Sequence, residues 1–158
     1  MATPDFIREL RSLIGTRPLW LTGATAVVTR ESDDGTEILL VRRSDNGEWS
    51  PVSGIVDPGE HPAVTAVREV SEEAGVTAKV EQLVWVTVTD MITYANGDQT
   101  RYLDHIFRCR WTGGEPHPAD GEATEAAFFG LDRLPPLRAD YAERVQAALT
   151  PAATTRLD

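Results

Sequence analysis

The sequence predicts an α/β fold in which a mixed β-sheet carries helices on both of its faces. Strand-like segments occur both before and after one strongly patterned helix over residues 62–74, and a second helix-like segment follows near the end of the chain. This order of elements fits helices packed against both faces of one sheet. With 158 residues, the chain is long enough for a single domain with a sizeable core.

The first elements are a short helix and a hairpin. Residues 4–14 carry apolar residues at helical spacing, and Pro4 is suited to open the helix. We expect this helix to pack as a lid on the domain or on a partner subunit rather than to carry function. Residues 20–29 and 37–43 read as two strands, and an Asp-Gly turn within residues 31–36 joins them into a hairpin.

The second half of the chain alternates strands with loops. The expected elements are a long strand over 79–93, a turn over 94–98, a strand over 99–111, a loop over 112–121, a strand over 123–129 and a helix over about 138–149. We divide the chain into an N-terminal helical extension over residues 1–16, a domain over 17–150 and a frayed tail over 151–158.

The helix over residues 62–74 has clear ends and two different faces. Pro62 suits its first turn, and Gly75 suits the position just past its end. One face is apolar and can be buried, with Ala63, Ala66, Val67, Val70 and Ala74. The opposite face gathers three carboxylates, Glu69, Glu72 and Glu73.

This acidic cluster is unfavourable unless a cation neutralises it. Like charges three or four residues apart repel, and the C-terminal end of a helix disfavours anions. Ligation by carboxylate oxygens suits Mg²⁺ or Mn²⁺. Arg68 lies four residues before Glu72 and could hold a carboxylate by a forked hydrogen bond. The alternative is an acidic helix face that is simply solvated.

The longer stretch around the helix carries a family pattern. It reads G-x5-E-x7-R-E-V-x-E-E-x-G-V, with fixed positions at Gly54, Glu60, Arg68, Glu69, Val70, Glu72, Glu73, Gly75 and Val76. This resembles the signature of the Nudix hydrolases (MutT-like and ADP-ribose pyrophosphatase-like), and every fixed position is matched. The resemblance implies an α/β/α sandwich with a mixed β-sheet and makes residues 17–150 a Nudix hydrolase domain.

The resemblance also implies an activity and a set of site residues. The activity is Mg²⁺-dependent hydrolysis of a diphosphate bond in ADP-ribose, a nucleotide sugar, a dinucleoside polyphosphate or a (d)NTP, with Mn²⁺ able to substitute. The implied roles are metal ligands at Glu69, Glu72 and Glu73 and at the Gly54 carbonyl, an orienting cation at Arg68, and an outer ligand or orienting partner at Glu60. The alternative is a catalytically silent module that binds a nucleotide metabolite.

The general base and the substrate contacts are less sharply defined by the sequence. In similar enzymes the base is a signature glutamate or a glutamate on a loop; here Glu122 and Glu125 are the loop candidates, and we favour Glu122. The alternative is that both are surface acids. The candidate substrate contacts are Arg42 and Arg43 for a phosphate, Trp49 for a base, and Tyr94, which in some similar enzymes accompanies dinucleoside polyphosphate substrates. Solvated arginines and a packed tryptophan are the competing interpretations.

Charge and cysteine content limit the partners. A net charge of −10 should repel nucleic acid and anionic membranes, so we expect neither partner and expect a small-molecule nucleotide substrate. The single cysteine, Cys109, excludes an internal disulfide and fits a reducing compartment. The sequence shows no apolar run of membrane-spanning length and no signal-peptide pattern, so we expect a cytoplasmic protein. A homodimer that uses the N-terminal helix is a further expectation.

Overall fold

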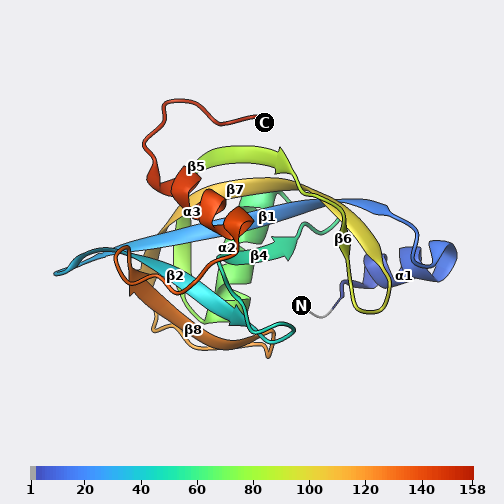
Figure 1. The fold of residues 1–158 in the computed structure, drawn as a ribbon, viewed down its shortest axis with the longest axis horizontal. Coiled ribbons are helices and arrows are strands. Elements are labelled where there is room, and N and C mark those ends of the chain that lie inside the picture. The colour runs from blue at the N-terminus through green and yellow to red at the C-terminus, as the bar shows by residue number, and fades with distance from the viewer. Residues whose placement is uncertain (1–2) are drawn as a thin grey trace.

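The computed structural model describes residues 3–158. In chain order its elements are α1 (Asp5–Ile14), β1 (Leu19–Ser32), β2 (Gly35–Arg43), β3 (Trp49–Ser50), β4 (Val52–Ile55), α2 (Pro62–Ala74), β5 (Thr77–Val88), β6 (Ile92–Thr93), β7 (Gln99–Gly113), β8 (Ala123–Gly130) and α3 (Ala139–Leu149). Figure 1 shows how the strands wrap around α2. Among the described residues, no helix is long and apolar enough to cross a membrane.

The sheet is mixed, as the sequence predicts. Its central order is β3-β2-β1-β7-β5, while β4 pairs with β1, β6 with β7 and β8 with β2. The long central strands β1 and β7 run parallel, from Leu19 opposite Thr100 to Thr29 opposite Arg110. The other named strand pairs are antiparallel, including the predicted hairpin of β1 and β2.

Helices cover both faces of the sheet, which confirms the predicted fold class. Side chains alternate along each strand, so successive residues enter different cores. On one face, Ala26 and Val28 of β1 pack in a cluster that contains Val70 and Ala74 of α2. On the other face, Val27 packs in a cluster with residues of α3, including Val145 and Ala148.

The boundaries of α2 follow the predicted stop signals. Pro62 opens the helix, and Gly75 ends it in the left-handed conformation with φ of 66°. The loop between β7 and β8 then satisfies carbonyls that the helix end leaves without partners. The Ala119 N–H donates to the Glu73 carbonyl at 3.3 Å, and the His117 N–H donates to the Ala74 carbonyl at 3.0 Å. This loop is therefore held next to the acidic end of α2.

Two local predictions differ from the structure. Gly54 lies in strand β4, opposite Ala24 of β1, in a segment for which no strand is predicted from the sequence. The predicted long strand over 79–93 is two strands, because three residues (89–91) face only two on β7 (101–102) between the flanking pairs. This extra residue interrupts the ladder, as a bulge does.

The C-terminal residues also differ from expectation. Instead of fraying, the segment after α3 returns to β5, the edge strand of the central order. The Arg156 N–H donates to the Val84 carbonyl, and the Val86 N–H donates to the Arg156 carbonyl, both at 2.9 Å. The Arg156 guanidinium stacks over the Trp85 ring at 4.1 Å. The tail therefore covers an edge that would otherwise present unpaired backbone groups.

Candidate active site

The three carboxylates of α2 have different environments. Glu69 and Glu73 are buried, with 2% and 7% of their surface exposed, whereas Glu72 is exposed. The expectation that all three lie on a face directed away from the core is wrong for Glu69 and Glu73. A periodicity argument sees only the helix itself, and here β4 and the loop after β7 pack against the acidic side of α2.

Gly54 makes the position of Glu69 possible. A Cβ atom at residue 54 would lie under 3.0 Å from the Cγ, Cδ and Oε1 atoms of Glu69, closer than real Cβ atoms come. The Glu69 side chain therefore occupies the space that any other residue at position 54 would fill. A glycine at this point of β4 lets a carboxylate lie directly on the backbone.

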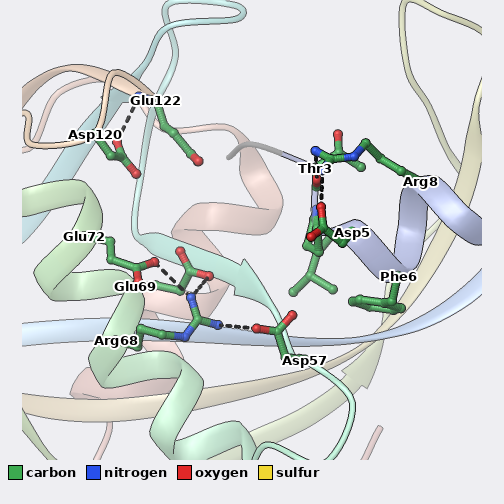
Figure 2. A pocket seen from close by; sticks show the side chains of 12 residues that line it. Thr3, Asp5, Phe6, Arg8, Asp57, Arg68, Glu69, Glu72, Asp120 and Glu122 are labelled. Carbon is green, nitrogen blue, oxygen red and sulfur yellow. Dashed lines mark hydrogen bonds and ion pairs between the residues drawn. The ribbon is translucent and has the colours of Figure 1, made fainter.

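Arg68 connects the acidic groups around it. Its Nε and Nη2 donate a forked pair of hydrogen bonds to Glu60, both at 3.0 Å. Its Nη1 donates to Glu69 Oε1 and to Glu72 Oε2, both at 2.9 Å (Figure 2). The forked geometry expected toward Glu72 is thus directed at Glu60. Arg68 also lowers the pKa of Glu60 to about 2, with help from the Thr65 hydroxyl.

Burial makes two of these carboxylates weak acids. Burial raises the pKa of Glu69 to about 7, against the opposing effect of Arg68, from an ordinary value of 4.5. Burial, and then the charges of Glu69 and Asp120, raise the pKa of Glu73 to about 8. Between about pH 4.5 and pH 8 the folded chain therefore binds more protons than the unfolded chain, and its stability falls as pH rises through this window. A bound cation would offset that loss.

The donor atoms fit an oxygen-preferring divalent cation. As the side chains stand, no group of three or more His, Cys, Asp or Glu residues within 3–158 is arranged to hold a metal ion. Glu69 and Glu72 instead accept hydrogen bonds from Arg68. Two carboxylates buried next to each other nevertheless need positive charge to remain ionised, and carboxylate oxygens suit Mg²⁺ or Mn²⁺. A release of Glu72 from Arg68 would add a third oxygen donor to the pair.

A cleft of about 680 Å³ opens beside these residues. Its lining includes Arg68, Glu69 and Glu72 from α2, Asp120 and Glu122 from the loop before β8, Ile55 at the end of β4, Asp57 after it, and residues 3–6 and 8 at the start of the chain (Figure 2). The volume is in the range of small-molecule sites. Of the lining residues within 3–158, six are acidic and two are basic, so an anionic ligand needs added positive charge beside them.

The structure separates the two candidates for a loop base. Glu122 lines the cleft together with Glu69 and Glu72. Glu125 lies on β8 and accepts a hydrogen bond from Arg42 at 2.8 Å. Of the two, Glu122 therefore has the better access to a ligand in the cleft.

The two strand-end arginines do not line the cleft. Arg42 donates to Glu125 and to the Gly47 carbonyl. Arg43 makes a forked pair of hydrogen bonds to Asp45, at 3.0 and 2.6 Å, which raises the pKa of the arginine. Their positive charge is therefore already matched by neighbouring carboxylates.

The two candidate aromatic contacts also lie outside the cleft lining. Trp49 packs edge-on against Phe129, with 5.0 Å between ring centroids, in the core next to α3. The Tyr94 hydroxyl lies 2.8 Å from the Tyr102 hydroxyl on the hairpin of β6 and β7. Trp49 is therefore a packing residue in this structure. The hydroxyl of Tyr94 is already paired with that of Tyr102 on the same hairpin.

Residues of α1 line the cleft, and sequence reasoning missed them. Phe6 and Arg8 face the α2 carboxylates across it (Figure 2). The sequence shows only an amphipathic pattern here, and nothing in that pattern indicates which element the helix will pack beside.

Comparison with known proteins agrees with this architecture. The family described as NUDIX domain matches residues 20–150. An ADP-ribose pyrophosphatase from Streptococcus suis has a TM-score of 0.61 and 28% identity, over 87% of this chain and 98% of that chain. A MutT NUDIX hydrolase from Burkholderia pseudomallei has a TM-score of 0.61 and 27% identity, over 84% of this chain and 99% of that chain.

A further solved structure extends the likeness at the level of the fold. The NUDIX domain of Shewanella oneidensis NrtR, complexed with ADP ribose, has a TM-score of 0.63 and 18% identity, over 94% of this chain and 97% of that chain. No curated protein matches the chain.

Proposed function

Because the chain belongs to the NUDIX domain family, we propose that it catalyses Mg²⁺-dependent hydrolysis of a diphosphate bond in a nucleoside diphosphate derivative. One observation carries this proposal. Glu69 and Glu73 are buried in the last turns of α2, and Glu69 lines a cleft together with Glu72. A helix end that gathers carboxylate donors in this way is suited to hold a divalent cation and, through it, a diphosphate.

The residues around the cation have separable roles in this proposal. Glu69, Glu72 and Glu73 hold it, with the Gly54 carbonyl as a further ligand. Arg68 and Glu60 fix the carboxylates through the hydrogen bonds described above. The cation, when bound, supplies counter-charge to the diphosphate and makes a water molecule more acidic.

Glu122 is the residue that we propose as the general base. It lines the cleft together with Glu69 and Glu72, on the loop before β8 (Figure 2). From there its carboxylate can accept a proton from a water that attacks a phosphorus held between the two walls. Glu125 provides a matched control, because it lies three residues along the chain and faces Arg42 instead.

ADP-ribose is the first substrate to test. The Streptococcus suis protein at 28% identity is described as an ADP-ribose pyrophosphatase, and the NrtR domain was solved with ADP ribose. Nucleotide sugars, dinucleoside polyphosphates and (d)NTPs belong to the same proposal, because all contain a diphosphate bond next to a nucleoside.

The experiment is a substrate panel measured in Mg²⁺, in Mn²⁺ and with chelator. We expect one class of compound to be cleaved far faster than the others, and the chelator to abolish turnover. Glu122→Gln should lose about 10²–10⁴-fold in kcat, the range of general base catalysis, while Glu125→Gln retains it. Calorimetric binding of a panel compound with no turnover in either metal would instead support the catalytically silent module.

A further inference from the structure

The cleft has a second wall that the family signature does not contribute. Residues 3–6 and 8, from the start of α1, line it opposite Arg68, Glu69 and Glu72 (Figure 2). This segment precedes residues 20–150, which match the NUDIX family. The wall facing the carboxylates therefore comes from a segment outside the family match.

One buried residue and the side chain of Arg11 attach the helix that forms this wall. Ile7 is buried, and Arg11 reaches from the next turn of α1 to the beginning of β7. The Nη2 atom of Arg11 donates to the Gln99 carbonyl at 2.8 Å and to the Thr100 hydroxyl at 3.1 Å. Its Nη1 donates to the Arg17 carbonyl at 2.6 Å. These contacts hold α1 beside the cleft.

Arg8 is the basic residue of the lining that is not engaged with the α2 carboxylates. The other basic residue of the lining, Arg68, is already bonded to Glu60, Glu69 and Glu72. Within residues 3–158, the Arg8 side chain pairs only with its near neighbours Asp5 and the Thr3 carbonyl, and it is 63% exposed. An exposed local ion pair contributes little free energy, so Arg8 can turn toward an anionic ligand at small cost.

Phe6 adds an aromatic ring to the same wall. It is half-buried and lines the cleft next to the start of α1. Nucleic-acid bases stack on aromatic side chains irrespective of their hydrogen-bonding pattern. The Phe6 ring could stack on the base of a nucleotide, and the Arg8 guanidinium could bind one of its phosphates. Both face the proposed site for the cation and the diphosphate.

We propose that α1 forms the nucleoside subsite of this cleft, with Phe6 against the base and Arg8 against a phosphate oxygen. This inference rests on the proposed function in one respect, namely that the diphosphate lies at the carboxylates of α2. It assigns substrate recognition to an element outside the family signature, and it favours substrates that carry an aromatic base.

The test compares kcat and KM for variants of the full chain on the best compound of the panel. Phe6→Ala and Arg8→Ala should each raise KM about tenfold and leave kcat within about twofold of the wild type. Phe6→Tyr keeps a ring and should retain the wild-type KM, whereas Phe6→Leu keeps only apolar volume and should resemble Phe6→Ala. Arg8→Lys should recover part of the loss.

Two variants serve as matched controls. Arg133 is 65% exposed and paired with its neighbour Asp132, much as Arg8 is paired with Asp5, but it lies outside the cleft lining. Leu13 is an exposed apolar residue of α1 that does not line the cleft. Arg133→Ala and Leu13→Ala should both keep the wild-type KM. An unchanged KM in Phe6→Ala and Arg8→Ala, or an equal rise in the controls, would overturn the inference.

A binding measurement separates this inference from the proposed function. If no compound is turned over, the proposed function fails, and calorimetric binding of ADP-ribose and the other panel compounds decides the inference alone. Weaker binding by Phe6→Ala and Arg8→Ala than by Arg133→Ala would then support the α1 subsite. Equal binding by all variants, or no binding of any compound, would overturn it.

Discussion

Replacing Gly54 by alanine tests the central packing feature of the site. The added Cβ would lie under 3.0 Å from three side-chain atoms of Glu69. Glu69 cannot simply move away, because it is buried and its Oε1 accepts a hydrogen bond from Arg68 at 2.9 Å. Gly54→Ala must therefore displace either the carboxylate or strand β4.

The expected cost is that of inserting a methyl group into a packed interior, about 1–3 kcal/mol. At about 3 °C per kcal/mol for a chain of this length, Tm should fall by about 3–9 °C. Displacement of Glu69 should also reduce the rise in Tm on adding Mn²⁺, which reports cation binding to the folded state. Gly113→Ala is the control, because its Cβ would meet Thr77 Oγ1 at an ordinary 3.4 Å.

A double variant identifies the cause of the loss. Glu69→Ala removes the atoms that the new Cβ would meet, so the loss of stability in Gly54→Ala/Glu69→Ala should be smaller than the sum of the two single losses. Scanning fluorimetry and chemical unfolding measure both quantities. Two results would contradict the claim that Gly54 makes room for Glu69. One is a Gly54→Ala protein with the same Tm and Mn²⁺ response as Gly113→Ala, and the other is a double variant whose losses of stability are strictly additive.

Three further predictions follow from buried or covered groups. The Mn²⁺-induced rise in Tm should grow from pH 6 to pH 8.5, because Glu69 and Glu73 lose protons there; a flat response would contradict their raised pKa values. Deleting residues 151–158 should lower Tm and increase self-association by light scattering, because the β5 edge is uncovered; an unchanged protein would show that the tail has no such role. Arg144→Ala should lower the free energy of unfolding by about 3–5 kcal/mol in chemical unfolding, because it breaks the buried salt bridge from Arg144 Nε to Asp104 at 3.0 Å. A loss below about 1 kcal/mol would contradict a stabilising role of this salt bridge.

Much of the fold follows from local signals in the sequence. Pro62 and Gly75 bound α2 as predicted, because a missing N–H and a positive φ are properties of single residues. The parallel pairing of β1 with β7 was not predictable in the same way. It joins residues about 80 positions apart, and the sequence of neither strand indicates which strand it pairs with.

The sequence names candidate site residues but does not indicate their environment. The spacing of Glu69 and Glu73 marks them as candidates, yet their burial depends on how β4 and the loop after β7 pack around α2. Tertiary packing also decides that Phe6 and Arg8 line the cleft while Trp49 enters the core. Such contacts between distant segments leave no periodic pattern in the sequence.

The most direct test of the account is the rate of diphosphate hydrolysis by Glu73→Gln beside the wild type at saturating Mg²⁺. Glutamine keeps the size of the side chain and removes a carboxyl group whose pKa burial raises to about 8. The account predicts a loss of at least about 100-fold in kcat, together with an unchanged or higher Tm of the metal-free protein. Turnover at the wild-type rate would contradict the proposed role of the α2 carboxylates.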